Sequence, residues 1–143
     1  MNMKKLISLA LAALLSFNTI LVVSADPDPE TPVEPGIIEE YQYTSSINSD
    51  LSISNNTATC RSTVIGFSNT ATRVEITQTL QKKSGNSWNF YTSWVKNYYT
   101  WYGILQTTKS GLSSGTYRLK TVAKVYSGNN YETITVYSYT ASC

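Results

Sequence analysis

From residue 41 onward, apolar and polar residues alternate in short runs, which is the pattern of half-buried β-strands. The clearest run covers 71–83, where Val74, Ile76 and Leu80 fall on one face of a strand. No long stretch keeps the apolar period of an amphipathic helix, and Thr, Tyr, Val and Ile are frequent throughout these runs. The pattern therefore predicts an all-β domain.

Turn residues divide this region at intervals typical of a sandwich. Asn55-Asn56, 84–87 and 127–130 each separate two alternating runs, and 111–115 is expected to be a loop. We expect about seven antiparallel strands in an immunoglobulin- or fibronectin-III-like β-sandwich, with a small closed β-barrel as the alternative. Tyr117 supports the sandwich, because this fold often has a tyrosine here whose hydroxyl bonds back to the preceding loop. The expected strands are 41–53 (one strand or a pair), 57–67, 71–83, 88–96, 99–108, 116–126 and 131–141.

The N-terminus has the three parts of a secretory signal. Lys4 and Lys5 precede an uncharged apolar run, which ends in the small-residue cleavage site Val23-Ser24-Ala25. We therefore expect residues 1–25 to be a signal peptide and the mature protein to be secreted, without a membrane span. The alternative is an uncleaved anchor, because the apolar run approaches the ~20 residues that cross a bilayer.

Charge separates the mature chain into two parts. Residues 26–40 hold six acids, four prolines and no base, a composition that predicts an extended linker without a core of its own. Residues 41–143, the predicted sandwich domain, hold nine Lys or Arg against three acids. An acidic arm on a basic domain indicates either an interaction tail or a plain solvated linker.

Cys60 and Cys143 are the only cysteines. Disulfides persist in exported proteins, and in an up-and-down order of seven strands the start of the second and the end of the seventh lie at the same pole. We therefore expect one Cys60–Cys143 disulfide, which would stabilise the fold by about 2–4 kcal/mol. Two free thiols, or an intermolecular bridge through Cys143, are the alternatives.

The sequence contains no histidine, which removes imidazole-based acid–base catalysis, histidine-assisted nucleophiles and imidazole metal ligands. The predicted domain has only three acids, Asp50, Glu75 and Glu132. Nothing in their spacing brings two together as a glycosidase needs, or clusters them as calcium needs. We expect no enzyme, no cofactor and no metal site, and a carboxylate-dependent hydrolase is the weakest of the alternatives.

Aromatic residues concentrate in 88–102. Strand alternation can bury only half of such a run, so some rings must lie at the surface or rim. Exposed Trp and Tyr suit stacking on sugar rings or anchoring a protein interface; the alternative is that they fill the core and line its edges. The candidate binding residues are Trp88, Tyr91, Trp94, Tyr98, Trp101 and Tyr102.

A second candidate surface is the outer face of the sixth predicted strand. Alternation puts Arg118, Lys120 and Lys124 there, and Arg73 joins them, with Glu75, if the third strand pairs beside the sixth. Such a face suits an acidic polymer or an acidic protein patch, or it is the solvated side of an ordinary strand. Nucleic acid is not expected, because the basic residues are sparse and no known binding module is visible.

Two segments carry a resemblance to a known family. They are NNTATCRSTVIGFSNTATRVEITQTLQKK at 55–83 and GTYRLKTVAKVYSGNNYETITVYS at 115–138. They resemble an uncharacterised family of small secreted proteins of Gram-positive bacteria, whose members combine a signal peptide with a single β-domain. The resemblance covers most of residues 44–140 and implies a bacterial extracellular location, but no site residues.

These features predict a secreted, non-enzymatic β-sandwich that acts as a binding or surface-interaction module. The aromatic stretch is the favoured contact region, and a cell-wall or other glycan, or a surface protein, is the expected partner. The alternative is a structural or accessory extracellular protein without a ligand of its own. No feature predicts the oligomeric state.

Overall fold

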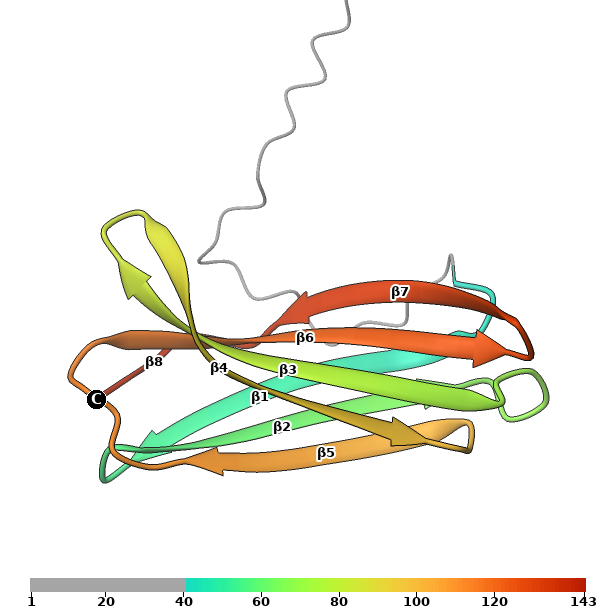
Figure 1. Ribbon diagram of the computed structural model, residues 1–143, viewed down its shortest axis with the longest axis horizontal. Helices are drawn as coiled ribbons and strands as arrows, with labels where there is room; N and C mark the ends of the chain where they lie inside the picture. The colour runs from blue at the N-terminus through green and yellow to red at the C-terminus, as the bar shows by residue number, and fades with distance from the viewer. Residues whose placement is uncertain (1–40) are drawn as a thin grey trace, which may run out of the picture.

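Strands and the turns between them make up residues 41–143, the part of the chain that this computed structural model describes (Figure 1). The predicted signal peptide at 1–25 and linker at 26–40 lie outside the described residues. The strands are β1 (Thr44–Ser54), β2 (Thr57–Gly66), β3 (Arg73–Ser84), β4 (Ser87–Tyr98), β5 (Tyr102–Lys109), β6 (Thr116–Ser127), β7 (Asn130–Tyr137) and β8 (Ala141–Ser142).

Buried and more exposed positions alternate along the central strands, as the sequence pattern predicts. In β6 the inward positions include Tyr117, Leu119 and Val125, which are all fully buried. Burying a large apolar side chain stabilises a fold by about 1.5–3 kcal/mol. Because slipping by one residue would turn the whole apolar set toward water, this alternation fixes the register of each strand.

Residues with a left-handed backbone close the tight hairpins. Asn55 and Asn56, between β1 and β2, have φ of 49° and 55°, as in a two-residue type I′ turn. Gly85 and Gly128 hold the first loop position of the β3–β4 and β6–β7 hairpins, at φ of 59° and 61°. The turns predicted at Asn55-Asn56, 84–87 and 127–130 are thereby confirmed.

The strands form two antiparallel sheets that pack face to face (Figure 1). One sheet has the order β1-β2-β5, and the other has the order β4-β3-β6-β7, with β8 pairing β6 beyond the end of β7. This order confirms the immunoglobulin- or fibronectin-III-like sandwich, and two open sheets exclude the closed barrel. The last predicted strand is interrupted at Ser138, whose hydroxyl accepts a hydrogen bond from the N–H of Leu119 at 2.8 Å.

Tyr117 makes the predicted contact with the loop that precedes its strand. Its hydroxyl donates to the carbonyl of Ser113 at 2.6 Å, while its side chain is fully buried. The ring of Tyr91 packs against it edge to face, with 5.4 Å between the ring centres. Tyr117 therefore ties the β5–β6 connection to the core.

A belt of buried polar side chains crosses the core, with Gln78 of β3 at its centre. The Gln78 amide donates to Ser62 Oγ and to the carbonyl of Leu105, both at 2.9 Å. Its oxygen accepts from Thr107 Oγ1 at 2.7 Å. The side chain of Gln78 is fully buried, so these bonds replace the water that it loses on folding.

Three hydroxyls continue the belt toward β1. Ser62 and Thr121 are hydrogen-bonded at 2.6 Å, Thr121 donates to Ser49 at 2.8 Å, and Ser49 donates to the carbonyl of Leu119 at 3.2 Å. We call Ser49, Ser62, Gln78, Thr107 and Thr121 the polar belt.

The polar belt separates two apolar clusters. One cluster contains Ile47, Val64, Ala71, Val74, Ile76, Leu105, Ala123, Val125, Ile134 and Val136. The other contains Ala58, Cys60, Leu80, Leu112, Tyr117 and Leu119. The sandwich therefore has an apolar core at each pole and the hydrogen-bonded polar belt between them.

Candidate functional site

The aromatic stretch does not form one surface, because a β-bulge interrupts β4. The register of β4 against β3 shifts at Tyr91, and an inserted residue of this kind changes which side chains face inward. Trp88 lies opposite Lys83 and points to the outer face of the sheet. Tyr91, Trp94 and Tyr98 pack against the core clusters instead. The candidate residues of β4 are thus divided between the core and one outer face.

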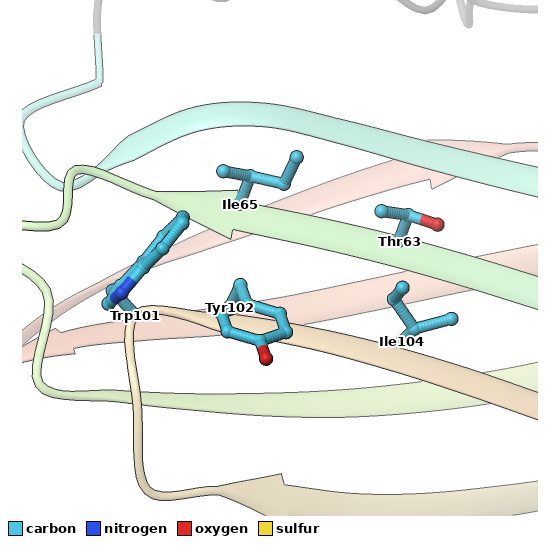
Figure 2. A pocket seen from close by; sticks show the side chains of 5 residues that line it. All are labelled: Thr63, Ile65, Trp101, Tyr102 and Ile104. Atoms are coloured by element: carbon cyan, nitrogen blue, oxygen red, sulfur yellow. The ribbon is translucent and has the colours of Figure 1, made fainter.

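Trp101 and Tyr102 form an exposed patch with residues of the β1-β2-β5 sheet (Figure 2). Ile65 lies opposite Tyr102 and Thr63 opposite Ile104, so these side chains share the outer face of β1-β2-β5. Trp101 is 38% exposed, Tyr102 47% and Ile104 44%. The two aromatic rings lie 4.9 Å apart, tilted by 60°. The five residues line a shallow, open depression of about 150 Å³, which we call the aromatic patch.

Planar polar side chains border the aromatic patch on the same face. Arg61 of β2 lies opposite both Asp50 and Gln106, and Asn48 lies opposite Thr63. Residues directly opposite one another in a sheet project to the same side. The Asn48 amide donates to the Asp50 carboxylate at 2.7 Å, which orients both groups. The outer face thus combines an apolar platform with hydrogen-bonding groups beside it.

Tyr98 supports the aromatic patch from inside the sandwich. Its ring packs so closely against Gly103 that a Cβ at this glycine would lie 2.5 Å from the ring. Its hydroxyl donates to the carbonyl of Ile104, and burial raises the pKa of Tyr98. Tyr98 therefore positions the part of β5 that carries Tyr102 and Ile104.

Arg118 is the centre of a second outer face, on β4-β3-β6-β7. Its guanidinium carbon lies 4.4 Å from the ring centre of Trp88 and 4.2 Å from that of Tyr137. Its Nε donates to Gln81 at 2.8 Å, which fixes the plane of the group. Desolvation lowers the pKa of Arg118, an effect that the neighbouring Tyr137 opposes. A cation thus lies between aromatic rings from the two edge strands of the sheet.

The predicted basic residues share this face, because β3 pairs beside β6. Arg73 lies opposite Tyr126 and stacks 3.7 Å from its ring centre. Glu75 lies opposite Lys124, with 3.9 Å between amine and carboxylate, and Lys120 projects from the same side of β6. We call this surface the cation–aromatic face; its charged and aromatic members are Arg73, Glu75, Lys83, Trp88, Phe90, Arg118, Lys120, Lys124, Tyr126, Tyr131 and Tyr137.

Sequence reasoning missed the partners of both surfaces. Ile65 and Ile104 complete the aromatic patch, and Tyr131 and Tyr137 complete the cation–aromatic face. Alternation alone gives the face of each side chain within its own strand. The missing information was which strands are neighbours, and this depends on the topology of the two sheets.

The predicted Cys60–Cys143 disulfide is wrong, because both thiols are free. The two cysteines do belong to the same apolar cluster, so the expectation of a common pole was sound. Cys60 is fully buried and has a hydrogen bond with the Thr107 side chain. The Cys143 thiol donates to the carbonyl of Ser113 at 3.0 Å. Each thiol thus has a protein partner other than the second cysteine.

The three acids of the sandwich lie in different surroundings. Asp50 lies on the outer face of one sheet and Glu75 on the outer face of the other. The carboxylate of Glu132 accepts the backbone N–H groups of Gln42 and Tyr43, both at 3.0 Å. Each acid therefore makes contacts of its own. Asp50 orients a neighbouring amide, Glu75 pairs with a lysine, and Glu132 holds the first residues of the described chain.

Within residues 41–143, no group of three or more Cys, Asp or Glu side chains gathers in a way that could hold a metal ion. The same residues include no helix long and apolar enough to cross a membrane. No protein-family model, curated protein or solved structure matches this chain.

Proposed function

We propose that this chain is a secreted, non-enzymatic binding module of the bacterial cell exterior, and that the aromatic patch holds a sugar ring of a cell-wall or other extracellular glycan. The observation that carries the proposal is the exposed pair of Trp101, in the β4–β5 connection, and Tyr102, at the start of β5, with planar polar side chains on the same face. Tyr102 and Ile104 lie on a strand, and strands hold a contact surface more accurately than loops do.

The chemistry of a sugar ring matches this arrangement. A pyranose has an apolar C–H face and a rim of hydroxyl groups. The rings of Trp101 and Tyr102, with Ile104 beside them, offer an apolar surface for the C–H face. Asn48 and Gln106 carry both amide donors and carbonyl acceptors, which suit hydroxyl groups at the rim.

The shape and charge of the aromatic patch favour a polymer with neutral sugar units. The depression is open and holds only about 150 Å³, whereas pockets that enclose a small molecule usually have ~300–1,000 Å³. Its five lining residues carry no charge. We therefore expect one ring of a longer chain to rest on the patch, with little dependence on salt.

The proposed location follows from the N-terminal export signal and from the resemblance to small secreted proteins of Gram-positive bacteria. A cell-wall polysaccharide is the glycan that such a protein meets first. The second candidate, an accessory protein without a ligand, lacks an explanation for the exposed apolar rings.

The first test is retention of residues 26–143 on bacterial cell walls, common polysaccharides and mucin, at low and physiological salt. We expect saturable retention that survives salt. We expect Trp101→Ala to weaken this binding by at least about tenfold, or ~1.4 kcal/mol. The wild-type circular dichroism spectrum should be preserved, because Trp101 lies in a connection and is partly exposed.

Tyr139→Ala is the matched control, since it removes a ring that is 63% exposed and lies outside both candidate faces. It should leave retention unchanged. Equal loss in both variants would refute a specific role for the aromatic patch. Absence of retention on every glycan would favour a surface-protein partner or an accessory role.

A further inference from the structure

The cation–aromatic face carries a large excess of positive charge. Five Lys or Arg side chains lie on it, and Glu75 is the acid among them. Rings lie beside these cations: Lys124 is 5.6 Å from the ring centre of Tyr131, and Arg118 lies between Trp88 and Tyr137. An occupant of this face should therefore combine negative charge with groups that pack on aromatic rings.

The described chain begins at the edge of the sheet that carries this face. Glu132 of β7 accepts the backbone N–H groups of Gln42 and Tyr43 at 3.0 Å. β7 is an edge strand of the sheet, and its neighbouring Tyr131 belongs to the cation–aromatic face. Residues 26–40 directly precede this point in the sequence, and the point lies at the edge strand of the sheet that carries the basic surface.

The composition of residues 26–40 matches both properties of the face. This segment holds six acids, four prolines and no base. Proline-rich segments dock in an extended conformation against aromatic side chains, while carboxylates pair with Lys and Arg. In DPDPETPVEPG, at 26–36, acids and prolines are interleaved, as cations and rings are on the face.

The segment is also long enough to cover the face. Its fifteen residues span roughly 45 Å when extended, at ~3.1 Å per residue. Crossing four strands at a spacing of ~4.8 Å requires only about 15 Å. The remaining length can run along the strands.

We propose that residues 26–40 lie across the cation–aromatic face of their own domain, with their carboxylates against Arg73, Arg118, Lys120 and Lys124 and their prolines against the neighbouring rings. Single exposed ion pairs are weak, but the tether gives the segment a millimolar effective concentration. The contact is electrostatic and thus sensitive to salt. It keeps the basic face from binding other polyanions.

The test uses residues 26–143, which include every strand of the sandwich. A nitroxide is attached at Thr31→Cys in a Cys143→Ser background, where the remaining Cys60 is fully buried. We expect amide NMR signals of Lys120, Lys124 and Tyr131 to lose more than about half of their intensity at low salt. They should recover near 0.5 M salt, where the Debye length is ~4 Å. Amides of Arg61 and Ile104, on the opposite sheet, should keep their intensity.

The matched control is the same labelled protein with Lys120→Glu and Lys124→Glu, in which the broadening should disappear. Broadening of both sheets alike, or none at low salt, would overturn the proposal. Broadening that arises between two copies, seen when nitroxide-labelled protein is mixed with protein that has no nitroxide, would overturn the proposal that the contact is intramolecular. The readout needs no glycan, so its failure is distinguishable from failure of the aromatic patch as a binding site.

Discussion

Gln78 makes three hydrogen bonds through its side chain, more than any other residue of the polar belt. It bonds to Ser62, Thr107 and the carbonyl of Leu105 while fully buried. Gln78→Ala would leave these groups without a partner and open a cavity, so we expect the free energy of unfolding to fall by about 2–4 kcal/mol. Urea denaturation monitored by tryptophan fluorescence measures this loss.

The control for this prediction is Gln106→Ala, which shortens an exposed glutamine on β5. It should change the free energy of unfolding by no more than about 0.5 kcal/mol. Equal effects in the two variants would mean that the polar belt contributes nothing beyond an ordinary side chain.

Cys60 and Cys143 should differ in their reactions with thiol reagents. The reactive species is the thiolate, and burial raises the pKa of Cys60 to about 11, although its hydrogen bond with Thr107 opposes this rise. At pH 8 we therefore expect Cys60 to remain unlabelled in the folded protein, whereas the half-buried Cys143 reacts. In denaturant without reductant, Ellman's reagent should count two thiols. A count of zero would show that the two cysteines form a disulfide after all.

At the residue scale, the sequence allowed the inward positions to be predicted but not their partners. Alternation correctly put Val74, Ile76 and Leu80 on one face, which is the buried inner face of β3. Hydrogen-bond partners such as Thr107 belong to strands far away in the sequence, so no local pattern could identify them. The disulfide prediction failed for the same reason, since a shared pole does not bring two thiols into contact.

At the scale of elements, the close contact between β4 and β5 leads to a prediction at Gly103. A Cβ at this position would lie 2.5 Å from the Tyr98 ring. Gly103→Ala should therefore destabilise the protein by about 1–3 kcal/mol through overpacking. In the Tyr98→Leu background the same substitution should cost less, and thermal melts of the four proteins in this double-mutant cycle measure the coupling. Equal costs in both backgrounds would contradict the contact.

Strand positions could be predicted from sequence better than strand irregularities. The turns at Asn55-Asn56, Gly85 and Gly128 have chemistry that is readable in the chain, and the strands between them follow. The bulge at Tyr91 has no such signal, because no glycine or proline marks it. This one inserted residue decides that Trp88 lies outside while Trp94 lies inside, so the aromatic stretch could not be assigned to a surface beforehand.

At the scale of the whole molecule, the two outer faces differ in chemistry. The β1-β2-β5 sheet carries the uncharged aromatic patch, and the β4-β3-β6-β7 sheet carries the cations. The fold class followed from strand count and spacing, and the pairing of β3 with β6 was foreseen as a condition for the basic face. The assignment of β5 to the sheet of β1 and β2 was not foreseen, and the aromatic patch depends on it.

The positions of the two ends of the described chain determine how the sandwich responds to a pulling force. The described chain begins at one pole, beside β7, and Cys143 lies at the opposite pole (Figure 1). A tensile load between Tyr41 and Cys143 would pull β1 and β8 in opposite directions along the strands. Because the hydrogen bonds of antiparallel strands lie perpendicular to that axis, the β1–β2 ladder is loaded in shear and many bonds must rupture together. Stretched between these two points, the domain should therefore resist a higher force than one whose hydrogen bonds break one at a time.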